Sequence, residues 1–214
     1  MDGIELIKKY FPELTPRQEH QFEVMGALYP EWNAKINVIS RKDIDNLFER
    51  HILHSLAIAK FLGPLADGTL FMDLGTGGGF PGLPLSVIYP GCKFHLIDRI
   101  AKKLRVADDI ARAAGIENVG FQHGDVGECH HKFNYVVSRA VMPLNEIVRL
   151  TVRNISPTSI NGNKYTNGII CLKGGDLTDQ TKGIRQPVIE FPLNEFIDEK
   201  AFEEKSIVYV AVKK

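Results

Sequence analysis

The spacing of hydrophobic positions divides the chain into a helical first third and a remainder in which short strands alternate with helices. Thr15, Pro16 and Gln18 predict a helix start with a capping box. Pro30 is expected to kink or split that helix, because proline lacks a backbone N–H. Apolar residues follow the start at alternating spacings of three and four, which is one helical face: Phe22, Met25, Tyr29, Trp32 and Ile36.

A second helical pattern covers residues 44–61, and the texture then changes to β-rich runs separated by helical segments. This alternation is typical of βαβ units and of a parallel sheet covered on both faces. The sequence therefore predicts an α/β fold, with a helical extension over 1–65 and a Rossmann-like core with a mostly parallel seven-stranded sheet over 66–214. The last two runs are expected to close the sheet, one of them antiparallel. The runs are 70–74, 93–97, 118–122, 135–138, 168–172, 188–191 and 207–212.

Composition narrows the class of protein without indicating a chemistry. The 214 residues suit one buried core with an appendage, and the 26 basic and 26 acidic residues cancel. Attraction to nucleic acid would therefore have to be local. Residues 99–112 hold five basic against two acidic side chains, and residues 190–204 hold six acidic against one basic.

Cysteine usage favours a cytoplasmic protein, and the amino terminus contains no apolar stretch typical of a secretion signal. The three cysteines lie far apart without a CxxC pair, which indicates reduced thiols. No run reaches the length of a membrane span, so no membrane partner is expected. The spacing of His123, Cys129, His130 and His131 matches no standard zinc set, and no metal is predicted.

The stretch DLGTGGGFPG, residues 73–82, places five glycines directly behind an apolar run. Such a cluster marks tight turning or close approach of the backbone to a ligand. A dinucleotide fingerprint GxGxxG can be placed on Gly77, Gly79 and Gly82, but it begins four residues after Asp73. A second register, D-x-G-x-G-x-G from Asp73, begins at the strand end.

The second register resembles motif I of the Rossmann-like class I S-adenosylmethionine-dependent methyltransferases. Asp98 ends the next strand, 19 residues after Gly79, where a carboxylate either accepts hydrogen bonds from ribose hydroxyls or caps a turn. HGDV, residues 123–126, follows the third strand, where such enzymes hold the adenine. Asp125 is equally explained as part of a Gly-Asp turn, and Asp73 could cap the turn after its strand. The resemblance implies S-adenosylmethionine as the cofactor.

Several stretches resemble one family in particular, the RsmG (also called GidB) enzymes, which methylate N7 of one guanine, at position 527, in bacterial 16S ribosomal RNA. GxGxGFPGxPL together with SRA is far more specific than the glycine pattern alone. The matching stretches span most of the chain in the expected order: WNAKINVIS (32–40), RHILHSL (50–56), DLGTGGGFPGLPLSVIYP (73–90), VVSRA (136–140) and LKG (172–174).

The resemblance implies a cofactor site around the glycine loop, with Arg139 in contact with cofactor or RNA. Arg139 follows a strand at the rim where open α/β sheets place ligands, although a surface ion pair is the alternative. Guanine N7 has no proton to lose, so no catalytic base is assigned, and catalysis is expected from orientation and electrostatics. The predicted cofactor-binding residues are Asp73, Gly75, Thr76, Gly77, Gly79, Phe80, Asp98, Asp125, Val126, Gly127 and Arg139.

Recognition of RNA would use basic side chains on phosphates and stacking on bases splayed from a loop. The expected partner is 16S rRNA or the small ribosomal subunit, and the protein is expected to be a monomer. For the basic side chains on the helix after Asp98, a solvated face is the other explanation. The candidate RNA contacts are Arg41, Lys42, Arg50, Lys102, Arg105 and Lys173.

Three departures from the family pattern keep other functions open. His54 stands where the family usually has aspartate, Asn134 stands near a common acid position, and the tail after Gly174 is short and lacks a basic segment. A small-molecule methyltransferase or an NAD-dependent oxidoreductase could use the same sheet, since fold does not fix function. A non-catalytic, cofactor-binding ribosome assembly protein is a further alternative. Cofactor preference and methyl transfer to RNA discriminate among them.

Overall fold

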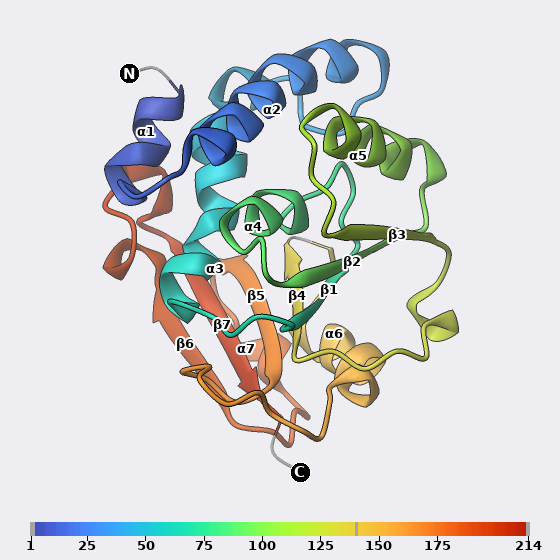
Figure 1. Cartoon of the computed structure of the whole chain (residues 1–214). Helices are drawn as coiled ribbons and strands as arrows, with labels where there is room; N and C mark the ends of the chain where they lie inside the picture. The colour runs from blue at the N-terminus through green and yellow to red at the C-terminus, as the bar shows by residue number, and fades with distance from the viewer. Residues whose placement is uncertain (1–2, 140, 213–214) are drawn as a thin grey trace.

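A seven-stranded sheet forms the centre of the computed structural model, which describes residues 3–139 and 141–212 (Figure 1). The strands are β1 (Leu70–Leu74), β2 (Lys93–Asp98), β3 (Val119–His123), β4 (Tyr135–Arg139), β5 (Gly168–Gly174), β6 (Val188–Pro192) and β7 (Lys205–Ala211). They lie in the order β3-β2-β1-β4-β5-β7-β6. The first five pair in parallel, and β7 is antiparallel to both β5 and β6. The predicted α/β class, with one antiparallel closing strand, is confirmed.

Helices cover both faces of this sheet. They are α1 (Gly3–Tyr10), α2 (Pro16–Lys35), α3 (His54–Leu62), α4 (Gly82–Ile88), α5 (Ala101–Ala113), α6 (Leu144–Thr151) and α7 (Thr178–Thr181). On one face, α3 packs against β5 and β7, α4 against β2, and α5 against β2 and β3. The helix α2 forms an outer layer over α4 and α5, while α6 packs against α7 at the other face (Figure 1).

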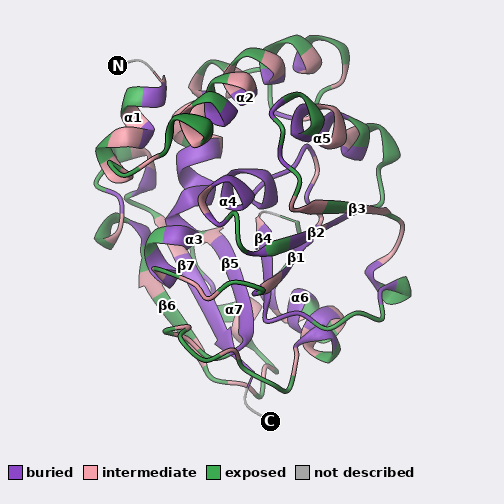
Figure 2. Ribbon diagram, viewed as in Figure 1, coloured by how far each residue is buried: buried purple, intermediate pink, exposed green. Residues whose placement is uncertain are grey.

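The central strands are mostly apolar because both of their faces are covered. Successive side chains of a strand point to opposite faces, so most positions of a buried strand are apolar. In β4, Tyr135 and Val137 join the core beneath α3 to α5, whereas Val136 joins the core beneath α6. In β5, Ile170 and Ile169 divide in the same way. Figure 2 shows β4, β5 and β7 buried along most of their length.

The start of α2 forms the predicted capping box. The Thr15 hydroxyl accepts a hydrogen bond from the Gln18 amide at 3.3 Å, and the Gln18 side chain accepts one from the Thr15 amide at 2.9 Å. Pro30 does not split the helix, since α2 continues to Lys35, and the alternative of a kink there remains a prediction. Tyr29 is buried beside the proline, and contacts of this kind hold a helix together where one backbone hydrogen bond is missing.

Residues 44–61 are helical as predicted, but three types of helical hydrogen bonding follow one another along them. A 3₁₀ turn, Ile44–Asn46, leads into a π-helix, Phe48–Leu53, and α3 follows directly. A π-turn is wider than an α-turn and is frequent at functional sites. The extension packs in one continuous apolar core with the sheet, and a domain boundary at residue 65 remains a prediction.

Other sequence expectations concern thiols, membranes and metals. Cys92, Cys129 and Cys171 are buried, free thiols in the described structure. Over residues 3–139 and 141–212, no helix is long and apolar enough to cross a membrane. Within the same residues, no group of three or more His, Cys, Asp or Glu side chains gathers where it could hold a metal ion.

Candidate active site

The glycine loop turns back over the carboxyl edge of the sheet immediately after β1. The Gly75 and Thr76 amides both donate to the Ile97 carbonyl of β2, at 2.8 and 3.1 Å. Gly75 and Gly77 have φ angles of +67° and +57°, a region that favours glycine. A Cβ at Gly75 would lie 2.6 Å from the Val141 side chain, and one at Gly77 would have only an atom of Lys103 within 4.0 Å. The backbone at Gly77 is therefore open to a ligand.

Asp73 lies buried beneath this loop and closes it. Its Oδ2 accepts hydrogen bonds from the Thr76 hydroxyl at 2.6 Å and from the Gly82 amide at 2.7 Å. Burial raises the pKa of Asp73 to about 7. The carboxyl therefore caps the turn, as one of the two interpretations of the sequence has it.

Asp73→Asn is expected to make folding less dependent on pH. Burial raises the pKa of Asp73 from 3.8 to about 7 in the folded protein, so the folded state favours the protonated carboxyl and stability falls as pH rises between those values. The Asn side chain keeps an oxygen acceptor and has no charge. Urea unfolding at pH 5 and pH 8 should show the variant gaining about 2–3 kcal/mol relative to the unsubstituted protein at the higher pH. An equal difference at both pH values would contradict this expectation.

A cavity of about 570 Å³, here called the glycine-loop cavity, opens between the loop and the carboxyl ends of β1, β2 and β4. It brings together seven of the predicted residues: Gly75, Thr76, Gly77, Phe80, Asp98, Val126 and Arg139. Four others do not line it: Asp73, Gly79, Asp125 and Gly127. Its wall also contains residues that were not predicted, among them Val38, Ile97, Arg99, Ile100, Lys103, Val141 and Met142.

Asp98 both caps the glycine loop and faces the cavity. Its Oδ2 accepts from the Gly77 amide and its Oδ1 from the Ile100 amide, each at 2.7 Å. A carboxylate has about four lone-pair positions, so these two bonds leave capacity for a ligand's hydroxyl groups. The two roles considered for Asp98 are thus compatible.

The Asp125 carboxylate is occupied by protein groups and does not line the cavity. Its Oδ1 accepts from the Gly127 amide at 2.6 Å, and its Oδ2 pairs with Arg99. These two partners hold the pKa of Asp125 below its usual range. Val126, which is buried, is the residue of this turn that lines the cavity.

Arg139, at the end of β4, connects the glycine-loop cavity with a second one. Its Nη2 donates to His51 Nδ1 at 2.8 Å, and its Nη1 donates to the Arg50 carbonyl at 3.3 Å. The guanidinium lies 5.0 Å from the centre of the Phe80 ring, a cation–π geometry. Burial lowers the pKa of Arg139 to about 10, so it stays cationic at neutral pH. Among the described residues it forms no ion pair with a carboxylate.

The second cavity, here called the basic cavity, has a volume of about 680 Å³. Four of its wall residues are cations and one is a carboxylate, Asp43, which pairs with Arg50 at 2.7 Å. The Lys173 ammonium donates to the Met142 carbonyl. The wall is made of Asp43, Arg50, His51, His54, Arg139, Leu172, Lys173, Gly174, Ala201 and Lys205.

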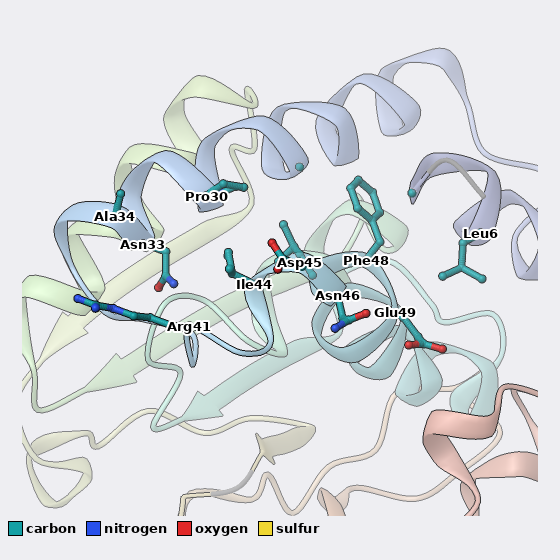
Figure 3. Close-up of a pocket in the computed structure, with 13 residues that line it drawn as sticks. Leu6, Pro30, Asn33, Ala34, Arg41, Ile44, Asp45, Asn46, Phe48 and Glu49 are labelled. Atoms are coloured by element: carbon teal, nitrogen blue, oxygen red, sulfur yellow. The ribbon is translucent and has the colours of Figure 1, made fainter.

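The other candidate RNA contacts lie away from these two cavities. Lys102 and Arg105 are exposed on α5, and Lys42 is exposed after α2. Arg41 lines a third hollow of about 650 Å³ between α1, α2 and residues 41–49 (Figure 3). In that hollow the Phe48 ring reaches up between the two helices. The third hollow shares no wall residue with the other two cavities.

Asn134 and His54, the two residues that depart from the family pattern, both make contacts within the described structure. Asn134 precedes β4, at the end of the strand opposite to Arg139, where its Oδ1 accepts from the Leu70 amide at 2.9 Å. Its side chain also donates to Asn167 at 3.2 Å, so it joins neighbouring strand ends. His54 is buried and stacks on Phe202 with ring centres 5.4 Å apart.

Solved structures agree with this fold. A precorrin-6y C5,15-methyltransferase from Geobacter metallireducens matches with a TM-score of 0.51 at 14% identity, over 84% of this chain and 92% of that one. Aeropyrum pernix fibrillarin, in complex with natively bound S-adenosyl-L-methionine, matches with a TM-score of 0.51 at 14% identity, over 76% of this chain and 75% of that one.

One cavity lies between the glycine loop, the acid at the end of β2 and the apolar turn after β3. Its backbone amides, its carboxylate and its apolar walls fit a nucleoside-containing cofactor, and the strand order of the sheet is one that binds such cofactors at this edge. The protein is a class I methyltransferase that uses S-adenosylmethionine. The chain belongs to the rRNA small subunit methyltransferase G (GidB) family, whose model matches residues 18–182.

Curated relatives cover nearly the whole chain. The "Ribosomal RNA small subunit methyltransferase G" of Bacteroides thetaiotaomicron is 51% identical over 206 residues, which are 96% of this chain and 98% of that protein. The protein of the same name from Bacteroides fragilis is 49% identical over 211 residues, which are 99% of this chain and 93% of that protein. The family resemblance drawn from the sequence motifs is confirmed.

Proposed function

We propose that this enzyme methylates N7 of one guanine in 16S ribosomal RNA, the guanine at position 527 in the family's substrate. The observation that carries this proposal is the position of Arg139, which forms a wall common to the glycine-loop cavity and the cation-rich basic cavity. A cofactor in the first cavity and a nucleotide in the second would meet at this residue. The names of the curated relatives support ribosomal RNA as the substrate class.

The residues of the glycine-loop cavity suit the two parts of the proposed cofactor. Bound S-adenosylmethionine supplies a methyl group activated on a sulfonium. The open backbone at Gly77 and the Asp98 carboxylate would hold polar groups, and Ile97 and Val126 would flank the adenine ring.

Positioning is the proposed source of catalysis. Guanine N7 carries a free lone pair, so the protein needs no side chain to remove a proton before attack. Arg139 is held by His51, the Arg50 carbonyl and the Phe80 ring. A guanidinium fixed in this way before the substrate arrives loses little freedom on binding.

For contact with RNA we propose a surface that extends from the basic cavity, at Arg50 and Lys173, to exposed cations on neighbouring elements. Such side chains would contact phosphates and set the position of the RNA. The exposed candidates are Arg41, Lys42, Lys102 and Arg105. We further propose that the enzyme acts as a monomer in the cytoplasm, on the rRNA or on the small subunit.

The test is transfer of radiolabelled methyl from S-adenosylmethionine to small ribosomal subunits lacking the modification, with deproteinised 16S rRNA in parallel. The proposal expects label on one guanine N7, and the better substrate identifies the natural partner. Tight binding of S-adenosylhomocysteine without label in either RNA would instead support a small-molecule methyltransferase or a non-catalytic assembly protein. Binding of NAD in its place would support an oxidoreductase.

A further inference from the structure

We propose that the basic cavity is the binding site for the acceptor nucleotide and that Lys205, on the last strand, holds a phosphate group of that nucleotide there. This inference rests on the proposed function, and it names a part of the site that the sequence motifs do not contain. The volume of about 680 Å³ lies within the range of roughly 300–1,000 Å³ typical of small-ligand sites.

The strand β7 returns antiparallel beside β5, and Lys205 is the register partner of Gly174, at the end of the LKG stretch. This pairing places Lys205 and Lys173 in one cavity wall with Arg139. The last strand therefore supplies a cation to the site.

The charges of the basic cavity are mostly positive. Among the described residues of its wall, the one carboxylate, Asp43, is paired with Arg50. Among the described residues, neither Lys173 nor Lys205 forms an ion pair. Burial, together with repulsion from Arg139 and Arg50, lowers the pKa of Lys205, and burial lowers that of Lys173. Asp43 and Glu49 attract Lys205 without pairing with it, and a phosphate group would provide a directly bonded counter-ion.

Lys205 lies against an aromatic ring. Its ammonium lies 5.2 Å from the centre of the Phe202 ring, and Phe202 stacks on His54. Phe202 is fully buried, and its ring gives the Lys205 ammonium a favourable cation–π contact before a ligand binds. Such a contact would reduce the entropy lost when the lysine is ordered on a phosphate.

Two histidine rings, His51 and His54, form an uncharged part of the cavity wall. His51 accepts a hydrogen bond from Arg139 through Nδ1, which assigns its proton to Nε2. Burial lowers the pKa of His51 to about 3 and that of His54 well below its usual range, so both rings are neutral. Both Nε2 atoms are buried, and within the described structure neither has a hydrogen-bond partner. A nucleotide suits this wall, because its phosphate would pair with the cations while its sugar or base would lie against the neutral rings.

The experiment compares Lys205→Ala with Lys200→Ala, a matched control in the same segment that is exposed and outside the cavity wall. The Kd of each protein for unmodified small ribosomal subunits is measured by filter binding, with S-adenosylhomocysteine present, at several salt concentrations. Lys205→Ala should weaken binding about tenfold, as expected for loss of one charge-assisted contact. The slope of log K against log salt should decrease by about 0.7–0.9. Lys200→Ala should change neither quantity.

Two further measurements separate binding from folding. Thermal unfolding of Lys205→Ala should show little change in stability, because the lost contact with Phe202 is offset by removal of the repulsion from Arg139 and Arg50. Lys205→Arg should restore most of the affinity. Equal Kd values and equal salt slopes for the two alanine variants would overturn the inference. Failure of the proposed function is a separate result, since it would appear as absence of methyl transfer by the unsubstituted enzyme.

Discussion

Arg139→Ala is expected to lower kcat/KM for small ribosomal subunits by at least about a hundredfold, which corresponds to about 3 kcal/mol of transition-state stabilisation. The reason is that this guanidinium is part of the wall of both cavities. Its removal would also leave the buried His51 Nδ1 without its donor. Steady-state transfer of labelled methyl measures the effect.

Two other variants identify the origin of the loss. Arg139→Lys keeps a positive charge but loses the planar fork that reaches His51 and the Arg50 carbonyl, so it should recover only a small part of the activity. Arg149→Ala, on the exposed side of α6, should behave like the unsubstituted enzyme. If Arg139→Ala lost less than about threefold in kcat/KM, the residue would serve only to fix the π-helix, and the proposed role would be wrong.

Asp98→Ala should weaken binding of S-adenosylhomocysteine by about a hundredfold, because the carboxylate has two functions at once. It holds the amides of Gly77 and Ile100, and it is the acid at the carboxyl end of β2 that lines the glycine-loop cavity. Hydrogen bonds to a charged acceptor contribute about 1.5–3 kcal/mol each. Isothermal titration calorimetry gives the affinity directly.

Asp98→Asn separates the two functions of this side chain. An amide retains one oxygen, so it can accept from Gly77 or from Ile100 but cannot serve both amides and a ligand hydroxyl. Its affinity should lie between those of the alanine variant and the unsubstituted enzyme. Asp109→Ala, in the following helix α5, is the matched control and should bind normally. An affinity of Asp98→Ala within threefold of that control would remove Asp98 from the proposed cofactor site.

The strands and the glycine loop could be predicted because each depends on residues that are close together in the sequence. A fully buried strand needs apolar residues at most positions, and the sequence at Val136 and Val137 shows this directly. The left-handed backbone at Gly75 requires glycine. The capping box at Thr15 is a contact between neighbours in the chain.

The rest of the site depends on contacts between distant segments, which no local signal contains. Lys205 enters the basic cavity only because β7 pairs with β5. His51 lies within the quoted stretch RHILHSL, but its importance depends on a hydrogen bond to Arg139, 88 residues later. Asp125 looked equally suited to a turn and to an adenine contact, and its hydrogen bonds in the structure are those of a turn.

The two cavities are completed at different times as the chain is synthesised. The residues of the glycine-loop cavity all lie between positions 38 and 150, whereas the basic cavity also needs Ala201 and Lys205. Because folding during synthesis proceeds from the amino-terminal end, the segments of the first cavity emerge while β7 is still missing. A growing chain can therefore have every segment of its glycine-loop cavity before its basic cavity is complete, and β7 is the element that completes the second cavity.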